Sequence, residues 1–209
     1  MNLIFEFFLN AYKDASLTQI VLEAIAFVFG IASVLFAKKE NIWVYPTGLV
    51  ATIISIYLLY TAGYFGDMMM NFYYSVMSIF GWWNWSRTDD GSRKTVISRT
   101  TSSEKWLGVL LCLLTMVITY AIYRIFGATI LPENYIDILT SGMFFTAMWY
   151  MATKKIENWI LWIIADLITV PLYAYRGLGM LSLQTLIFTF LAIQGYRKWN
   201  QRIKKRIVA

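Results

Sequence analysis

The chain has 209 residues, of which 59% are hydrophobic and 14% are charged, and its mean hydropathy is +0.57. Soluble domains are about half apolar and about a quarter charged, so this composition excludes an ordinary soluble protein and indicates an integral membrane protein. The formal net charge of +6 is of the sign that binds nucleic acid. We nevertheless expect no nucleic-acid partner, because basic residues at the cytoplasmic rim of a membrane protein give the same excess.

Seven apolar stretches follow one another along the chain, after an N-terminal segment (1–14) that is too short to span and is predicted to lie in the membrane interface. A helix needs about 20 apolar residues to cross about 30 Å of hydrocarbon, so seven spans account for most of the sequence. We therefore predict an all-α integral membrane protein with seven transmembrane helices. The stretches lie at 18–37, 42–62, 66–85, 106–126, 136–152, 158–175 and 179–196.

Basic residues are concentrated in alternate gaps between these stretches. Of the 18 Lys and Arg residues, 15 lie in one alternate set, and the other set holds only Lys13, Arg124 and Arg176. The positive-inside rule places the rich gaps in the cytoplasm, so we predict an outside N-terminus and a cytoplasmic C-terminus. The rich gaps include a polar linker at 86–105, which we expect to be mobile, and a basic tail at 200–209.

The sequence also repeats itself. Gly81-x3-Trp85 matches Gly195-x3-Trp199 at a separation of 114, Gly63 matches Gly177 at the same separation, and residues 38–43 match 154–159 at 116–117, which predicts a small gap.

We therefore predict three-helix units at 15–85 and 133–199. Both units begin on the outer side, so the span at 106–126 must return the chain as an inverter helix. The result is a 3+1+3 arrangement of parallel repeats, which in transporters places the binding site between the repeats near the midplane.

Polar and aromatic residues form a stripe in each unit. Spacings of three, four and seven place five residues of the third stretch on one helical face, and the sixth stretch repeats the pattern. A charge at the centre of a span costs about 2.5–3.5 kcal/mol, so the carboxyl groups are not expected to face lipid. The stripes are Asp67, Asn71, Tyr74, Ser78 and Trp85 in the third stretch, and Trp162, Asp166, Thr169 and Tyr173 in the sixth.

Buried carboxyl groups have two interpretations: a helix–helix hydrogen bond or a ligand site. Two stripes that combine carboxylates with aromatic rings favour a ligand site, because a flat organic cation binds through ion pairs and cation–π contacts. The predicted substrate-binding residues are Asp67, Asn71, Tyr74, Trp82, Trp85, Trp162, Asp166, Tyr173, Gln184 and Glu23.

Other functions are less consistent with the residues present. The sequence has no His, a single cysteine (Cys112) and no Walker loop, so we expect no metal, no cofactor and no ATP hydrolysis. A membrane enzyme would need such a group, and a receptor or scaffold would not need two polar stripes. A proton-coupled transporter remains an alternative, because Glu23 and Asp166 could relay protons.

Two motifs give the chain a family resemblance. Asn71-x2-Tyr74-x5-Phe80-Gly81-Trp82-x2-Trp85, and Asn158-Trp159-x2-Trp162 followed by Asp166, Tyr173 and Gly195-x3-Trp199, resemble the Pnu family of bacterial vitamin transporters from about residue 20 to 199. Asp137, Thr140 and Ser141 also fit that family.

The resemblance implies a 3+1+3 fold related to the SWEET proteins, in the bacterial cell membrane. It further implies facilitated diffusion of an unphosphorylated vitamin, trapped inside by a cytoplasmic kinase that need not contact the transporter.

The resemblance also indicates a substrate. The family's nicotinamide riboside branch carries Trp at the position of Asp67 and Gln at that of Asn71, and its Tyr is replaced here by Phe80. The chain is in this respect more similar to the thiamine branch, and a carboxylate and an amide can hydrogen-bond an aminopyrimidine cation. We therefore predict thiamine, with nicotinamide riboside, also a cation, as the alternative. The sequence leaves open whether the protein forms a homo-oligomer.

Overall fold

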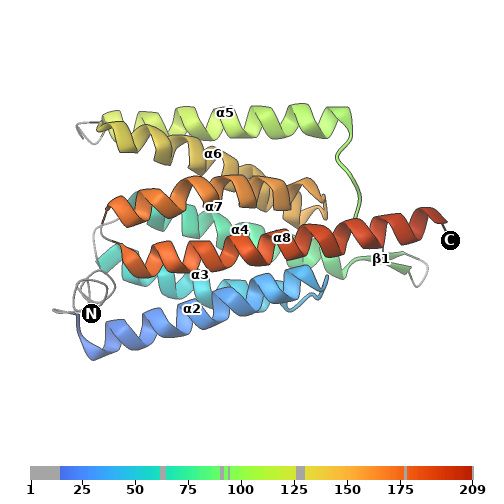
Figure 1. Cartoon of the computed structure of the whole chain (residues 1–209), viewed down its shortest axis with the longest axis horizontal. Helices are drawn as coiled ribbons and strands as arrows, with labels where there is room; N and C mark the ends of the chain where they lie inside the picture. Colours follow the sequence, from blue (N-terminus) through green and yellow to red (C-terminus); the bar gives the residue numbers. More distant parts are fainter. Residues whose placement is uncertain are drawn as a thin grey trace.

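The computed structural model describes residues 15–61, 65–89, 92–93, 95–125, 130–176 and 178–208 (Figure 1). Each of the seven apolar stretches corresponds to one helix within these ranges, and the predicted interfacial segment at 1–14 lies outside them. The elements are α2 (Leu17–Lys38), α3 (Val44–Thr61), α4 (Phe65–Ser86), β1 (Thr88–Asp89), β2 (Ser92–Arg93), α5 (Ser102–Ile125), α6 (Pro132–Ala152), α7 (Glu157–Tyr175) and α8 (Gly179–Val208).

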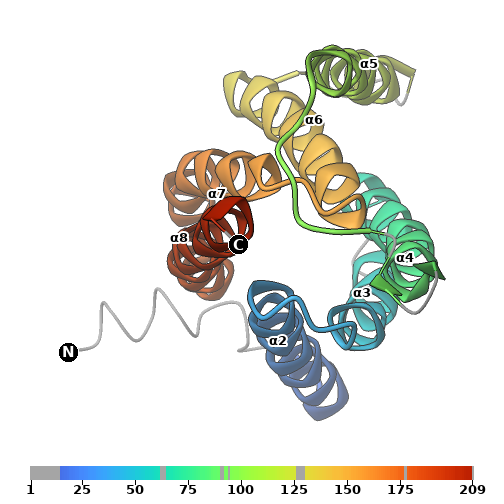
Figure 2. The ribbon, with the colours of Figure 1, turned by 90° about the vertical axis from the view of Figure 1, so that its right-hand side faces the viewer.

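Six of the helices form a closed ring, and the seventh lies outside it (Figure 2). Around the ring the packing order is α2, α3, α4, α6, α7 and α8, and α8 closes the ring against α2. Helix α5, the predicted inverter, packs on α6. The helices α2 to α4 thus meet α6 to α8 along two seams, α4 with α6 and α2 with α8.

The outer surface of the bundle is apolar. On α5 alone, Leu110 is 60% exposed and Val117 is 64% exposed, as expected of side chains that contact lipid tails. Five helices (α2, α3, α5, α7 and α8) are long and apolar enough to cross a membrane. Polar residues lower the hydropathy of α4 and α6, which complete the same ring. The chain is a multi-pass membrane protein.

Local sequence explains how the helices begin and end. Ser16 starts α2 with a capping box, in which its Oγ accepts from the Gln19 backbone N–H at 3.3 Å and Gln19 Oε1 accepts from the Ser16 N–H at 3.0 Å. Pro132 begins α6 at a position where its missing N–H costs nothing. Just beyond α2 and α6, Glu40 (φ 58°) and Lys154 (φ 56°) adopt the left-handed conformation that turns the chain into the next helix.

The structure corrects the register of the predicted repeat. Glu40 and Lys154, which make the same turn, are 114 residues apart. Tyr45 and Trp159 share that separation and each packs against a glycine, Gly81 and Gly195 respectively. One constant separation of 114 residues therefore holds from these turns to the two glycines, with no gap between them. The match of residues 38–43 with 154–159 is a coincidence of composition, since Trp43 is 58% exposed whereas Trp159 is 2% exposed.

Each half of the ring caps a helix of the other half. Trp85 of α4 donates its indole N–H to the Ala152 carbonyl at the end of α6 (3.2 Å), and Trp199 of α8 donates to the Ala37 carbonyl at the end of α2 (3.0 Å). Both bonds are buried and cross a seam. Around them Tyr45 and Trp159 complete an aromatic core at the basic end of the bundle.

Residues 95–101 of the linker pack against the bundle, where we expected a mobile segment. Ile97 is 5% exposed, and Ser98 exchanges backbone hydrogen bonds with the turn between α6 and α7, accepting from Ile156 (3.0 Å) and donating to Lys154 (3.1 Å). Residues 200–208 of the predicted basic tail belong to α8, which continues as one helix to Val208. Composition suggested mobility here, but buried apolar contacts and paired backbone groups decide the outcome.

We expect Gly81→Ala and Gly195→Ala each to destabilise the protein by about 1–3 kcal/mol, the usual cost of overpacking a core. An added Cβ would lie 2.4 Å from the Tyr45 ring or 2.7 Å from the Trp159 ring, and both rings are buried. Gly30→Ala is the control, since its Cβ would meet Phe188 at an ordinary 3.5 Å. Thermal unfolding in detergent measures the difference; equal stability of the three variants would contradict the steric argument.

Candidate functional site

Aromatic side chains from α4, α6 and α7 meet at one seam of the ring. The Trp162 ring lies 5.3 Å from Phe144 and 6.2 Å from Tyr74, measured between centroids. Beside them Tyr73, the residue before Tyr74, stacks on Phe145 at 3.7 Å and donates its hydroxyl to the Phe145 carbonyl at 2.9 Å. The structure thus brings together two residues of the predicted stripes, Tyr74 of the first half and Trp162 of the second.

Asp166 lies one helical turn beyond Trp162 and is 4% exposed. Within the described part of the chain its carboxyl group has no hydrogen-bond or ion-pair partner. The nearby Thr169 hydroxyl donates instead to the Ala165 carbonyl of its own helix, at 2.8 Å. A buried carboxyl group normally has a partner, so this one is chemically available for a ligand.

The other seam, between α2 and α8, carries the predicted Gln184. Its side-chain nitrogen would lie 3.7 Å from a Cβ placed on Gly30, so this amide faces α2. Asn71 on α4 is half-buried, as is Glu23 on α2. The Asp67 side chain lies outside the described residues, although its backbone belongs to α4.

Two further predicted site residues lie on α4. Trp82 is 42% exposed. Trp85 is buried in the aromatic core at the basic end, 5.1 Å from Tyr45 and 6.1 Å from Trp199. Equal helical spacing put Trp85 on the predicted face, but it lies almost four turns from Asn71, at the end of the helix rather than near its middle. A role of either residue in substrate binding stays a prediction.

An ion pair marks the end of the bundle opposite the aromatic core. Arg176, after α7, binds the Asp137 carboxylate of α6 through two hydrogen bonds of 3.1 and 2.6 Å. This contact raises the pKa of the Arg176 guanidinium, mainly through the hydrogen bond to Asp137. The half-buried Tyr173 lies one turn before it. The sequence offered one signal for this pair: Arg176 is a lone basic residue in a gap otherwise poor in charge.

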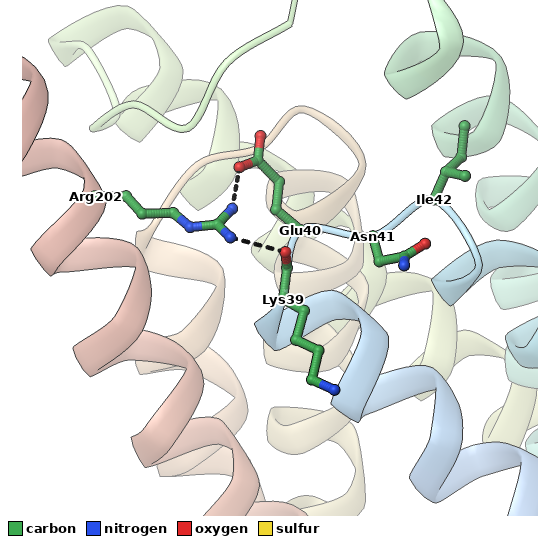
Figure 3. A pocket seen from close by; sticks show the side chains of 5 residues that line it. All are labelled: Lys39, Glu40, Asn41, Ile42 and Arg202. Atoms are coloured by element: carbon green, nitrogen blue, oxygen red, sulfur yellow. Dashed lines mark hydrogen bonds and ion pairs between the residues drawn. The ribbon is translucent and has the colours of Figure 1, made fainter.

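At the basic end, a pocket of about 310 Å³ is lined by Lys39, Glu40, Asn41, Ile42 and Arg202 (Figure 3). Glu40 accepts hydrogen bonds from Arg202 and from Lys154, and Arg202 also donates to the Lys39 carbonyl at 3.0 Å. None of the residues predicted to bind substrate lines this pocket. Sequence reasoning missed it because it assigned these charges only to the positive-inside pattern.

A ring of long apolar helices with buried polar and aromatic groups at its seams is the architecture of a membrane transporter. The chain belongs to the nicotinamide mononucleotide transporter family, whose model matches residues 20–201, and so to the Pnu family that its motifs resemble.

Curated relatives and a solved structure agree with this assignment. The chain is 24% identical to the nicotinamide riboside transporter PnuC of Escherichia coli (strain K12), covering 88% of this chain and 87% of the relative. It is 20% identical to the riboflavin/roseoflavin transporter RibM of Streptomyces davaonensis, covering 85% and 84%. It shares its fold with the crystal structure of the vitamin B3 transporter PnuC, with a TM-score of 0.71 and 23% identity over 94% of this chain and 86% of the other.

The predicted preference for thiamine is not supported by these relatives. That prediction depended on Asp67 and Asn71, one of which has a side chain outside the described residues. The charge argument did not separate thiamine from nicotinamide riboside, because both are cations. The alternative, nicotinamide riboside, agrees better with the relatives.

Proposed function

We propose that this protein carries nicotinamide riboside across the bacterial cell membrane by facilitated diffusion. The observation that carries the proposal is Asp166, a buried carboxyl group without a described partner, one turn from the ring of Trp162. The nicotinamide ring of the riboside is a flat aromatic cation, and a carboxylate beside aromatic faces matches that chemistry. Riboflavin, the cargo named for one relative, has no such charge to balance.

Within the proposed site the residues have different roles. Trp162 and Tyr74 offer ring faces to the pyridinium, and Asp166 balances its charge. Asn71 and Gln184 can hydrogen-bond the carboxamide or ribose, and Glu23 and Tyr173 lie on helices that line the same ring. Asp67, Trp82 and Trp85 stay predicted site residues to which we assign no contact with the riboside.

We also propose that α2–α4 and α6–α8 are two units related by a pseudo-two-fold axis along the membrane normal, with α5 as the inverter between them. The constant separation of 114 residues and the paired Trp85 and Trp199 bonds support this arrangement. Parallel repeats of this kind operate by movement of one unit against the other around a central site.

Facilitated diffusion alone does not concentrate a substrate. We propose that a cytoplasmic kinase phosphorylates the riboside after entry, so that uptake remains net inward. The kinase acts on the product of transport and needs no contact with the transporter. No ATP-binding loop occurs in the sequence, which is consistent with a driving force from outside the protein.

Uptake into proteoliposomes tests the proposal. We expect saturable entry of labelled nicotinamide riboside without a pH or sodium gradient, competition by unlabelled riboside, and little competition by riboflavin or thiamine. Stronger competition by thiamine or riboflavin would reassign the substrate. Uptake that requires an inward proton gradient would instead favour the proton-coupled alternative, in which Glu23 and Asp166 relay protons.

The orientation is tested by cysteine labelling at the two ends of α5, in a Cys112→Ala background. We expect Thr101→Cys to react with an impermeant thiol reagent from the cytoplasmic side and Leu131→Cys from the outside. Both positions are exposed, and the charge distribution places the Thr101 end in the cytoplasm. Reaction of both cysteines from the same side would contradict the predicted orientation.

A further inference from the structure

We propose that Glu40, Lys154 and Arg202 form a gate at the basic end of the bundle, which holds that end closed and must separate when substrate is released there. We call these three residues, together with the Trp85 ring, the clasp. The inference rests on the proposed transport function, because it assigns the closed end of an alternating-access cycle.

Lys154 is at the centre of the clasp. Its side chain is 0% exposed, and its ammonium lies 2.9 Å from Glu40 Oε1, 3.0 Å from the Thr95 carbonyl and 4.6 Å from the centre of the Trp85 ring. One cation thus joins four segments: the turn after α2, the turn after α6, the linker and the end of α4.

The clasp crosses both seams of the ring. Lys154 belongs to the α6–α8 half and contacts Trp85 across the seam between α4 and α6. Arg202 of α8 binds Glu40 and the Lys39 carbonyl across the seam between α2 and α8 (Figure 3). Movement of one half away from the other at this end would therefore break contacts of all three charged residues.

The opposite end is tied differently. Among the described residues, the ion pair there joins Asp137 to Arg176, and both lie within the α6–α8 half. Described ion pairs between the two halves occur only in the clasp. While the clasp is closed, the halves are held together at the basic end and can separate at the opposite end, which is one of the two states that alternating access requires.

A buried ion pair suits a gate that has to open repeatedly. Desolvation of two charges offsets most of their attraction, so an open state in which both ions regain water stays populated as a minor state. The backbone conformation adds to this balance. Glu40 and Lys154 are both left-handed, a conformation that non-glycine residues keep only where surrounding contacts hold it.

The test measures access to a buried cysteine from the basic end. Ala192→Cys, in a Cys112→Ala background, places a thiol that is 2% exposed one turn beyond Phe188, in the core cluster that also contains Ala37 of α2. Inside-out vesicles present this end to an impermeant thiol reagent. We expect Lys154→Met to raise the labelling rate by about ten-fold or more, because the open state becomes a larger fraction of the ensemble.

Lys155→Met is the matched control. Lys155 is the next residue at the same end, but its ion pair with Glu104 (2.7 Å) joins the α6–α7 turn to α5 and crosses neither seam. We expect its labelling rate to equal that of the parent. Equal acceleration in both lysine variants would mean general loosening of the bundle and would overturn the gate.

Lys154→Met leaves Glu40 paired with Arg202, so the Glu40 carboxylate keeps an ion-pair partner. Size-exclusion profiles and thermal unfolding check that the variant folds. If it does not, Glu40→Gln decides by the same readout, since its amide keeps the shape of the carboxylate. Unchanged labelling in whichever variant folds overturns the gate. The labelling readout needs no substrate, so it tests the gate separately from the cargo. If Lys154→Met raises the labelling rate but the protein does not bind nicotinamide riboside, the proposed cargo is wrong and the gate is supported.

Discussion

Asp166→Asn is expected to weaken the binding of nicotinamide riboside by about 100-fold or more. Removing one partner of a buried charge pair costs about 3–5 kcal/mol, and each 1.4 kcal/mol is a factor of ten in affinity. The substitution preserves the shape of the side chain and deletes only its charge. It should not harm the fold, because the carboxyl group has no described partner to lose. Isothermal titration calorimetry on detergent-purified protein measures the change.

The control for this prediction is the ligand itself in its reduced form. Reduced nicotinamide riboside has nearly the same shape but a neutral dihydropyridine ring, so its affinity should change by less than about three-fold, the scale of an exchange between neutral hydrogen-bonding groups. If both forms lose affinity equally, Asp166 positions the helix and does not balance charge. If neither form loses affinity, the carboxyl group lies outside the binding site.

Trp162→Ala is expected to weaken riboside binding by about 30-fold. A desolvated cation–π contact contributes about 2 kcal/mol, which corresponds to that factor. Trp162→Phe keeps a ring face and should recover most of the affinity, whereas loss of the whole ring also removes the contacts with Phe144 and Tyr74. The same calorimetric titration applies.

Trp106→Ala provides the comparison for Trp162. Trp106 is 75% exposed on α5, outside the ring, so its removal should leave affinity unchanged. Equal losses in the Trp162 and Trp106 variants would point to a general effect of indole removal on the membrane-embedded protein. An unchanged affinity in Trp162→Ala would exclude this seam as the riboside site.

Much of the fold could be predicted because the relevant signals are one-dimensional. Apolar length located all seven helices to within a few residues at most ends, and helical spacing placed Tyr74 and Trp162 on faces that meet in the structure. The same spacing could not say how far along the helix a residue lies from the midplane. It therefore gave no sign that Trp85 lies in the aromatic core at the end of the bundle.

The remaining errors have a common physical origin, which is contact between segments far apart in sequence. The linker reads as a mobile polar segment until Ile97 is seen buried and Ser98 is seen paired with the α6–α7 turn. From the sequence, Lys154 was interpreted as one of the basic residues on the cytoplasmic side. The residues next to it in the sequence do not predict that its side chain is 0% exposed. The predicted register of the repeat was wrong for a similar reason. Residues 38–43 and 154–159 are similar in sequence, but they do not occupy equivalent positions in the two halves.

The two buried tryptophan bonds have a consequence for how the protein is made. The indole of Trp199 on α8 reaches the Ala37 carbonyl at the end of α2, a contact that spans 162 positions of the sequence. Helix α8 must therefore be synthesised and inserted before α2 can complete its final contacts, and helices α2 to α4 lack those contacts until then. The ring cannot mature helix by helix from its N-terminus. It closes when α8 packs against α2 and Trp199 donates to the Ala37 carbonyl.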